Sequence, residues 1–273
     1  LANFMEENGL KGAEKLPLGF TFSFPVNQEG LDVGKLIHWS KGFNATGVQG
    51  QDVVKLLKEA CARRGVSSPN QSSSFIDLDM DIDVVAILND TVGTLLACAF
   101  KENSCQIGVI LGTGTNACYM EKLSNCPKLR KLHLEKDNFP KEMIINMEWG
   151  AFGDDGGLDF IRTPYDAAVD EATVNPGLHL FEKMISGMYM GELVRLVLEH
   201  LAKQRLVFDG DTTAISQANV FPTKYVSEIE GEQDDPTNPY QKTMQILQEI
   251  GIEKPSVADC TAVAYVCSLI STR

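Results

Sequence analysis

The sequence lacks the features that define several large classes of protein. It has no apolar run long enough to cross a bilayer and no recognisable secretory signal peptide. Lysine and arginine number 24 against 37 acidic residues, which gives a formal net charge of -13, and they form no cluster long enough to follow a phosphate backbone. These absences argue against a membrane-spanning protein, against binding to nucleic acid and against binding to an anionic membrane surface.

Cysteine is present, but not in the patterns that mark disulfide frameworks or metal sites. The seven cysteines are scattered, and no two of them are spaced Cys-x-x-Cys. Free thiols in a reducing compartment are the simplest explanation, so we expect a cytoplasmic protein. Hydrophobic residues make up 44% of the 273 residues, which is ordinary for a globular protein of one or two domains.

Both ends of the chain read as interior sequence. No initiator methionine is present, and the helical spacing that begins at Leu1 has no start signal before it. Ser256 is a good N-cap for a helix that reaches Arg273 without a stop signal. We therefore expect the chain to be the interior of a longer protein.

A carboxylate follows a buried strand near the middle of the sequence. Residues 84–88 are an all-apolar run typical of such a strand, and residues 91–100 have the pattern of a helix. Asn89 and Asp90 lie between the two, at the carboxyl end of the strand, where open α/β sheets bind their ligands. The alternative is that Asp90 is only a helix N-cap, and position alone favours that role.

A glycine-rich loop follows the next predicted strand, over residues 105–111. The loop is Gly-Thr-Gly-Thr-Asn, residues 112–116. Glycines let a backbone approach a ligand closely and can point successive N–H groups at a phosphate. The pattern is neither a Walker loop nor G-x-G-x-x-G, so a tight hairpin turn with a return strand over 117–120 is the alternative, and both roles can hold at once.

Other polar residues sit where a ligand could be held. Ser23 lies at the end of a predicted strand over 18–26, and Ser40 and Lys41 lie in a loop flanked by aromatic residues. Glu148 stands among apolar neighbours, which predicts a buried carboxylate that needs a partner. Each of these residues could instead have a purely structural role, as a hydrogen-bonded hydroxyl, a solvated lysine or a member of a structural ion pair.

Helical periodicity predicts helices over residues 51–64, 179–203 and 240–250. Glu182 lies near the start of the second, where the helix dipole favours a carboxylate whether or not it binds a ligand. Gly187 and Gly191 in that helix are expected to allow close packing. Residues 66–74 and 234–239 are predicted loops, and residues 204–233 are mixed in character.

An acidic run resembles a calcium loop but does not fit one. Asp77, Asp79, Asp81 and Asp83 alternate with apolar residues, yet Ile82 stands where the loop requires glycine and no glutamate closes it. A half-exposed lead into the following strand fits the alternation better.

Several segments together, in this order, resemble the eukaryotic hexokinase and glucokinase family. They are LGFTFSFP at 18–25, WSKGF at 39–43, LNDTVGT at 88–94, LGTGTNACYME at 111–121, NMEWGAFGD at 146–154 and ELVR at 192–195. The resemblance covers the whole chain and implies an α/β fold of the actin-like ATPase (ribonuclease H-like) class, with two domains that close on a sugar-binding cleft. Residues 1–89 would belong to the small domain and residues 90–273 to the large domain, each in part.

Carried over onto matching positions, the resemblance implies two catalytic residues and two binding sites. Asp90 would take the proton from the sugar 6-hydroxyl, and Lys41 would be the second catalytic residue. The sugar contacts would be Ser23, Phe24, Ser40, Lys41, Asn89, Asp90, Asn116, Glu148 and Glu182. The nucleotide contacts would be Gly112, Thr113, Gly114, Gly187, Met188, Thr223 and Ser227.

The implied function is ATP-dependent phosphorylation of the 6-hydroxyl of glucose and related hexoses, the first step of glycolysis, with ATP and Mg²⁺ as cofactors and no metal ligand in this chain. The residue chemistry agrees, because a polyol needs carboxylates and amides around its hydroxyls, and phosphoryl transfer needs a proton acceptor and charge neutralisation. The partner is a hexose such as glucose, and attachment to mitochondria is compatible with the sequence. The alternative is a non-catalytic hexose-binding fragment or regulatory relative. A third hypothesis, another actin-like ATPase without a sugar substrate, is poorly supported, because the carboxylates around the cleft would then have no ligand to bind.

The chain also departs from the family pattern. A phosphate hairpin resembling Asp-Leu-Gly-Gly-Thr-Asn and an adenosine-contacting glycine-rich segment are absent from the sequence. Leu178 and His179 occupy positions where the family pattern has glutamine. We therefore expect an active full-length enzyme and little or no turnover from the 273 residues alone.

Overall fold

The computed structural model describes residues 1–10, 16–63, 82–132, 140–232 and 239–273. Contacts divide the chain into two units. Unit 1 comprises Leu1–Val109 and Ala117–Met147, and unit 2 comprises Ile110–Asn116 and Glu148–Arg273. The domain boundary predicted between residues 89 and 90 stays a prediction.

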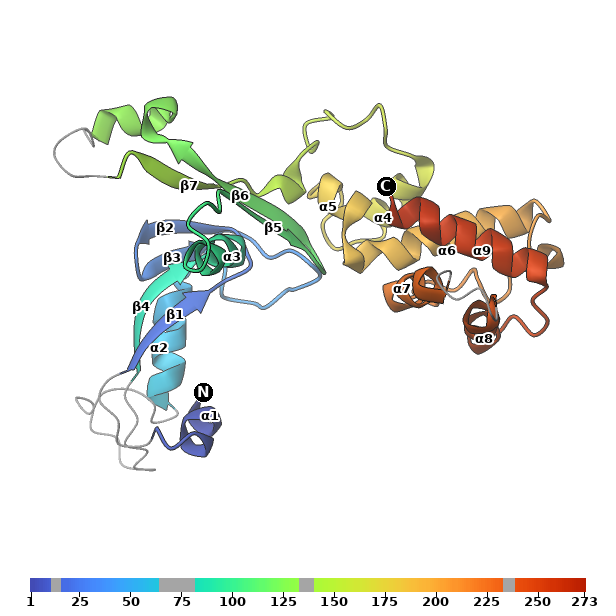
Figure 1. Ribbon diagram of the computed structural model, residues 1–273, viewed down its shortest axis with the longest axis horizontal. Coiled ribbons are helices and arrows are strands. Elements are labelled where there is room, and N and C mark those ends of the chain that lie inside the picture. Colours follow the sequence, from blue (N-terminus) through green and yellow to red (C-terminus); the bar gives the residue numbers. More distant parts are fainter. Residues whose placement is uncertain (11–15, 64–81, 133–139, 233–238) are drawn as a thin grey trace. The chain divides into compact units, whose positions relative to one another are not determined.

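Unit 1 contains two strand pairs and a helix that covers them (Figure 1). β1 (Leu16–Thr21) runs parallel to β4 (Ile82–Leu88), β2 (Val26–Gly30) is antiparallel to β3 (Val33–Leu36), and α2 (Val53–Arg63) packs against β3 and β4. The predicted strand 84–88 and helix 51–64 are confirmed, apart from residue 64, which lies outside the described residues. The core that these elements share contains Leu36, Val53, Val54, Val84 and Ile87.

The parallel pairing of β1 with β4 fixes where these two strands end. Thr21 lies opposite Leu88, and the N–H of Phe22 donates to the Leu88 carbonyl at 2.9 Å. The prediction of one strand over 18–26 is wrong: β1 ends at Thr21 and β2 begins at Val26. Pro25, which has no N–H to give to a ladder, stands between them. As a result, the residues after β1 lie beside the residues after β4.

α3 (Asp90–Ala99) follows β4 and packs on a three-stranded sheet. The strand order in that sheet is β5 (Ile107–Leu111), β6 (Thr115–Lys122) and β7 (Glu142–Asn146), so the predicted return strand is confirmed. A Cβ atom at Gly108 would lie 2.8 Å from the carbonyl oxygen of Thr91, so glycine allows this close approach of α3 to β5. The remaining short elements of unit 1 are α1 (Ala2–Glu7), η1 (Leu123–Asn125) and η2 (Pro127–Leu132).

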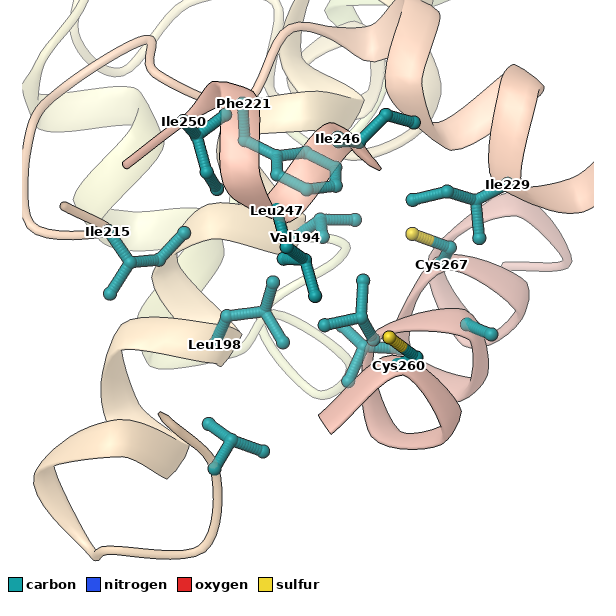
Figure 2. Close-up of a cluster of buried hydrophobic side chains, with 14 of the residues drawn as sticks. Val194, Leu198, Ile215, Phe221, Ile229, Ile246, Leu247, Ile250, Cys260 and Cys267 are labelled. Carbon is teal, nitrogen blue, oxygen red and sulfur yellow. The ribbon is translucent and has the colours of Figure 1, made fainter. Parts of the chain in front are cut away.

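Unit 2 is mainly helical. Its elements are η3 (Trp149–Ala151), α4 (Pro164–Glu171), α5 (Leu180–Ile185), α6 (Gly187–Lys203), η4 (Phe208–Gly210), α7 (Thr223–Glu232), α8 (Gln241–Glu249) and α9 (Val257–Ser271). Figure 2 shows the core, in which side chains of α6 to α9 such as Val194, Ile229, Ile246 and Cys267 pack together. The helix predicted over 240–250 and the N-cap role of Ser256 are confirmed. All seven cysteines are free thiols, as predicted.

The long helix predicted over 179–203 is wrong in one respect, because it is two helices. Ser186, between α5 and α6, is extended with φ -88° and ψ 157°. The break lets the N–H of Gly187 donate to the carbonyl of Gly112 at 2.8 Å, a bond that a continuous helix would have used internally. Apolar spacing continues through Ser186, so periodicity could not reveal the break. Helix α7 was also not predicted; it lies within residues 204–233, which were expected to be mixed in character.

Some predictions fall outside the described residues. These are the loop over 66–74, residues 234–238 of the second loop, and the acidic positions Asp77, Asp79 and Asp81. Asp83, the last residue of that acidic run, lies in β4 and is partly buried. Its place in a strand agrees with the strand lead-in that the alternation predicts.

Candidate functional site

Two strand ends bring Ser23 and Asp90 together in unit 1. The Ser23 hydroxyl donates to Oδ2 of Asp90 at 2.6 Å, and Oδ1 of Asp90 accepts the N–H of Thr91 at 2.9 Å. Asn89 is the N-cap of α3, and its Oδ1 accepts the same N–H at 2.8 Å. The cap role therefore belongs to Asn89. The carboxylate of Asp90 is partly exposed and is held in orientation from both sides.

Lys41 lies beside this pair. Its backbone is left-handed, with φ 56°, and Gly42 follows with φ 76°. The Lys41 ammonium donates to the Ser23 carbonyl at 3.0 Å and lies 5.5 Å from the centre of the Phe24 ring. Ser40 is buried, with 3% of its surface exposed. The turn thus directs a cation toward the segment that carries Ser23.

Aromatic side chains hold this turn in place. The rings of Phe24 and Trp39 meet edge to face with centroids 4.8 Å apart, and Phe24 meets Phe43 at 5.1 Å. The indole N–H of Trp39 donates to the Ala45 carbonyl at 2.9 Å. Such edge-to-face pairs add stability beyond the area that they bury, so they restrain the loop that bears Lys41.

A second group of predicted residues lies in unit 2. Glu182, in the first turn of α5, is 3% exposed, and its Oε2 accepts the backbone N–H of Thr115 at 2.9 Å. The Asn116 amide donates to Oε1 of Glu148 at 3.4 Å. Glu148 itself is only partly buried, so the prediction of a buried carboxylate is wrong. It has left-handed backbone with φ 50° just after β7, which breaks the alternation of the strand before it.

Gly150 lets these segments approach one another. A Cβ atom there would lie 3.3 Å from Cβ of Glu182, from Nδ1 of His179 and from the carbonyl oxygen of Thr115. All three neighbours would have to give way to admit a side chain. The Glu148 segment, α5 and the start of β6 therefore meet at this one glycine.

The start of α5 is held by Asp154, which sequence reasoning missed. The backbone N–H groups of His179 and Leu180 donate to the two carboxylate oxygens of Asp154 at 2.9 and 2.8 Å. The carboxylate supplies the acceptors that the exposed amides of a helix start need. Asp154 belongs to the glycine-rich turn Gly-Asp-Asp-Gly-Gly, residues 153–157. No local signal connects that turn with a helix 25 residues later.

A buried ion pair also positions α5. The Lys183 ammonium donates to Oδ1 of Asp170 at 2.7 Å, with 2% and 7% of the two side chains exposed. Burial works against the charged carboxylate, but hydrogen bonds from Lys183 and Gly177 hold the pKa of Asp170 below its usual range. Burial, with the negative charges of Glu182 and Asp170, raises the pKa of Tyr189 to about 12.

The glycine loop, residues 112–114, is held by the first turn of α6. Gly187 and Met188 donate their backbone N–H groups to the carbonyls of Gly112 and Thr113 at 2.8 and 3.2 Å. A Cβ atom on Gly187 would lie 2.9 Å from the Gly112 carbonyl oxygen. The predicted nucleotide residues Gly187 and Met188 therefore place the loop through their own amides, while Thr113 is exposed.

Thr223 joins α7 to the same place. Its hydroxyl donates to the Gly187 carbonyl at 2.5 Å and accepts the N–H of Gly191 at 2.9 Å. A Cβ atom on Gly191 would lie 2.3 Å from the Phe221 carbonyl oxygen, which confirms the predicted close packing at both glycines. Ser227, one turn further along α7, is exposed.

The predicted site residues thus form two groups. The first, in unit 1, contains Ser23, Phe24, Ser40, Lys41, Asn89 and Asp90. The second, in unit 2, contains Gly112, Thr113, Gly114, Asn116, Glu148, Glu182, Gly187, Met188, Thr223 and Ser227.

Neither group forms a metal cage. Across the described ranges, no cluster of three or more histidine, cysteine, aspartate or glutamate side chains could hold a metal ion. Within the same ranges, no helix has both the length and the apolar character to cross a membrane.

Two family models match the chain, and both are described as hexokinase. One matches residues 1–100 and the other residues 106–273. Curated relatives include hexokinase-2 of Homo sapiens, 47% identical, and hexokinase-1 of Rattus norvegicus, 46% identical, in each case over the whole chain. The chain spans 27% of the length of each of these relatives.

Two solved structures are also similar. A hexokinase from Schistosoma mansoni complexed with glucose is 38% identical, with a TM-score of 0.81 over 99% of this chain and 56% of that chain. A second hexokinase is 30% identical, with a TM-score of 0.68 over 98% of this chain and 55% of that chain. The actin-like ATPase class that the sequence implies is confirmed by these likenesses.

Proposed function

Since this chain belongs to the hexokinase family, we propose that the protein containing it transfers the γ-phosphoryl group of ATP to the 6-hydroxyl of a hexose. The family models cover nearly all of the chain. Because the chain spans 27% of its curated relatives, the activity is proposed for the whole protein. Glucose is the proposed substrate, since the solved relative from Schistosoma mansoni is complexed with it.

The Asp90 carboxylate carries the proposal. It lies at a strand end, is partly exposed, and is fixed by Ser23 and by the N–H of Thr91. Such a carboxylate can accept the proton of an attacking hydroxyl, a role worth about 10² to 10⁴ in rate. Lys41, which donates to the carbonyl of Ser23, would stabilise negative charge that develops during transfer.

The second group of residues suits the recognition of a polyol. Glu182, Glu148 and Asn116 present carboxylate and amide groups to which sugar hydroxyls can bond. A site built to satisfy each hydroxyl discriminates strongly against an analogue that lacks one, because a buried polar group is then left unpaired. We assign these residues to hexose binding.

The glycine loop suits a phosphate. Thr113 is exposed in this loop, and backbone amides near glycine can approach phosphate oxygens closely. Mg²⁺ usually binds through one or two carboxylates and the substrate phosphates, and keeps several of its waters. When bound, the ion would neutralise phosphate charge during transfer. The free thiols support a cytoplasmic location.

Asp90→Ala tests the proposal in the protein that contains this chain. Glucose 6-phosphate formation from glucose and MgATP is measured by a coupled assay, and glucose binding by calorimetry. We expect turnover to fall by about 10² or more while glucose binding persists. Glu59→Gln, an exposed carboxylate of α2, is the control and should change neither quantity. A wild-type protein that binds glucose without phosphorylating it would instead be the non-catalytic relative.

A further inference from the structure

Thr115 makes three hydrogen bonds to three different segments of unit 2. Its backbone N–H donates to Oε2 of Glu182 at 2.9 Å. Its hydroxyl donates to the carbonyl of Ile110 at 3.0 Å and accepts the indole N–H of Trp149 at 2.9 Å. The residue is 4% exposed, so these bonds form away from solvent, where each one is hard to replace with water.

One of these bonds sets the base of the glycine loop. Ile110 and Thr115 flank the loop, so the hydrogen bond between them joins the two ends of the loop. Within the loop, the N–H of Gly112 donates to the Gly114 carbonyl at 2.9 Å. The start of α6 holds the loop from the other side through Gly187. A change at Thr115 would therefore alter the loop that we assign to phosphate.

The other two bonds reach the residues that we assign to the hexose. Trp149 directly follows Glu148, and its ring meets the ring of Phe181 edge to face at 5.9 Å. Phe181 in turn precedes Glu182, whose carboxylate accepts the N–H of Thr115. The Thr115 carbonyl also borders the crowded position at Gly150. Both carboxylates are thus linked to Thr115, one by a direct bond and one through the adjacent tryptophan.

We propose that Thr115 is a positioning residue that couples hexose binding to nucleotide binding, through its bonds to Glu182, Trp149 and the base of the glycine loop. The inference rests on the proposed function. A hexose that fixes Glu182 and Glu148 restrains Thr115, and through it the loop. Coupling of this kind is reciprocal, so MgATP tightens hexose binding by the factor by which hexose tightens MgATP binding.

The test is calorimetric titration of glucose into the protein that contains this chain, with and without the Mg²⁺ complex of β,γ-imido-ATP. In the wild type we expect the nucleotide analogue to tighten glucose binding by about fivefold or more. Thr115→Val keeps the backbone bond to Glu182 but removes both hydroxyl bonds. It should bring this factor close to one, while glucose affinity without nucleotide changes by less than about threefold. Thr115→Ser should restore the coupling.

Controls separate the possible failures. Thr261→Val removes an exposed threonine hydroxyl of α9 and should leave the coupling at its wild-type value. If Thr115→Val does not fold, Trp149→Phe decides, because it removes the indole N–H donor while it keeps an aromatic ring beside Phe181, and it should reduce the coupling on its own. Full wild-type coupling in the folded variants would overturn the inference. A wild type that binds neither glucose nor the analogue would instead overturn the proposed function.

Discussion

The Ser23 hydroxyl donates to Oδ2 of Asp90 at 2.6 Å, although 67 residues separate the two in sequence. The parallel pairing of β1 with β4 brings both strand ends to one place, and the N–H of Thr91 holds the other carboxylate oxygen at 2.9 Å. The orientation of the Asp90 carboxylate is therefore set by bonds from within unit 1 to both of its oxygens.

Ser23→Ala tests whether this orientation matters for turnover. A hydrogen bond to a charged group contributes roughly 1.5–3 kcal/mol, and only part of it bears on the transition state. We expect kcat to fall about tenfold, with a smaller change in the KM for glucose. Steady-state kinetics with glucose and MgATP measure both. Ser104→Ala, at an exposed turn of unit 1, is the control. An unchanged kcat in Ser23→Ala would show that the hydroxyl does not orient the base.

Gly187→Ala tests the contact between α6 and the glycine loop. The added Cβ would lie 2.9 Å from the Gly112 carbonyl oxygen, which is too close without a shift of the loop. We expect the KM for MgATP to rise by about tenfold and the KM for glucose to change much less, since one misplaced contact can cost this much or more. Gly231→Ala in α7 is the matched control, because its Cβ would meet nothing within 4 Å. Equal effects on both substrates would contradict the assignment of the loop to phosphate.

The parts of the fold that local sequence pattern encodes were predictable. The apolar run of β4, the polar residues that follow it and the glycine-rich turn before β6 all act over a few residues, and the structure places them as predicted. The break at Ser186 and the cap from Asp154 depend on partners more than 20 residues away, namely Gly112 and the start of α5. The spacing of apolar residues along the sequence reflects only local structure, so it cannot reveal partners that are so distant in sequence.

Lys183→Met tests the buried ion pair beneath α5. Removal of Lys183 leaves the buried Asp170 carboxylate with Arg162, at 2.8 Å, as its remaining ionic partner. We therefore expect a loss at the lower end of the roughly 3–5 kcal/mol in free energy of unfolding that breaking a buried pair costs. Urea denaturation followed by circular dichroism measures the loss. Lys35→Met breaks the exposed pair with Glu29 and should cost no more than about 1 kcal/mol. Similar small losses in both variants would mean that the buried pair contributes little to stability.

The lowered pKa of Asp166 is expected to make the protein less stable in acid. Burial disfavours its charge, but hydrogen bonds from Arg273 and Thr163 outweigh that effect and hold its pKa below the ordinary value of 3.8. The unfolded chain therefore binds a proton at higher pH than the folded chain does. It follows that the contribution of Asp166 to stability is fully present above about pH 5, and is lost as the pH falls through the folded-state pKa.

Asp166→Asn should therefore lower the urea midpoint at pH 7 and make the midpoint less dependent on pH between 5 and 3 than in the wild type. The reason is that asparagine cannot form the paired bonds of 2.6 and 2.7 Å with the Arg273 guanidinium as a charged acceptor. Asp159→Asn, in an exposed turn, should leave both the midpoint and its slope with pH near wild-type values. If Asp166→Asn kept the full acid dependence, the loss of stability in acid would have to come from carboxylates elsewhere, such as Asp170 or Asp259, whose pKa values are also held low.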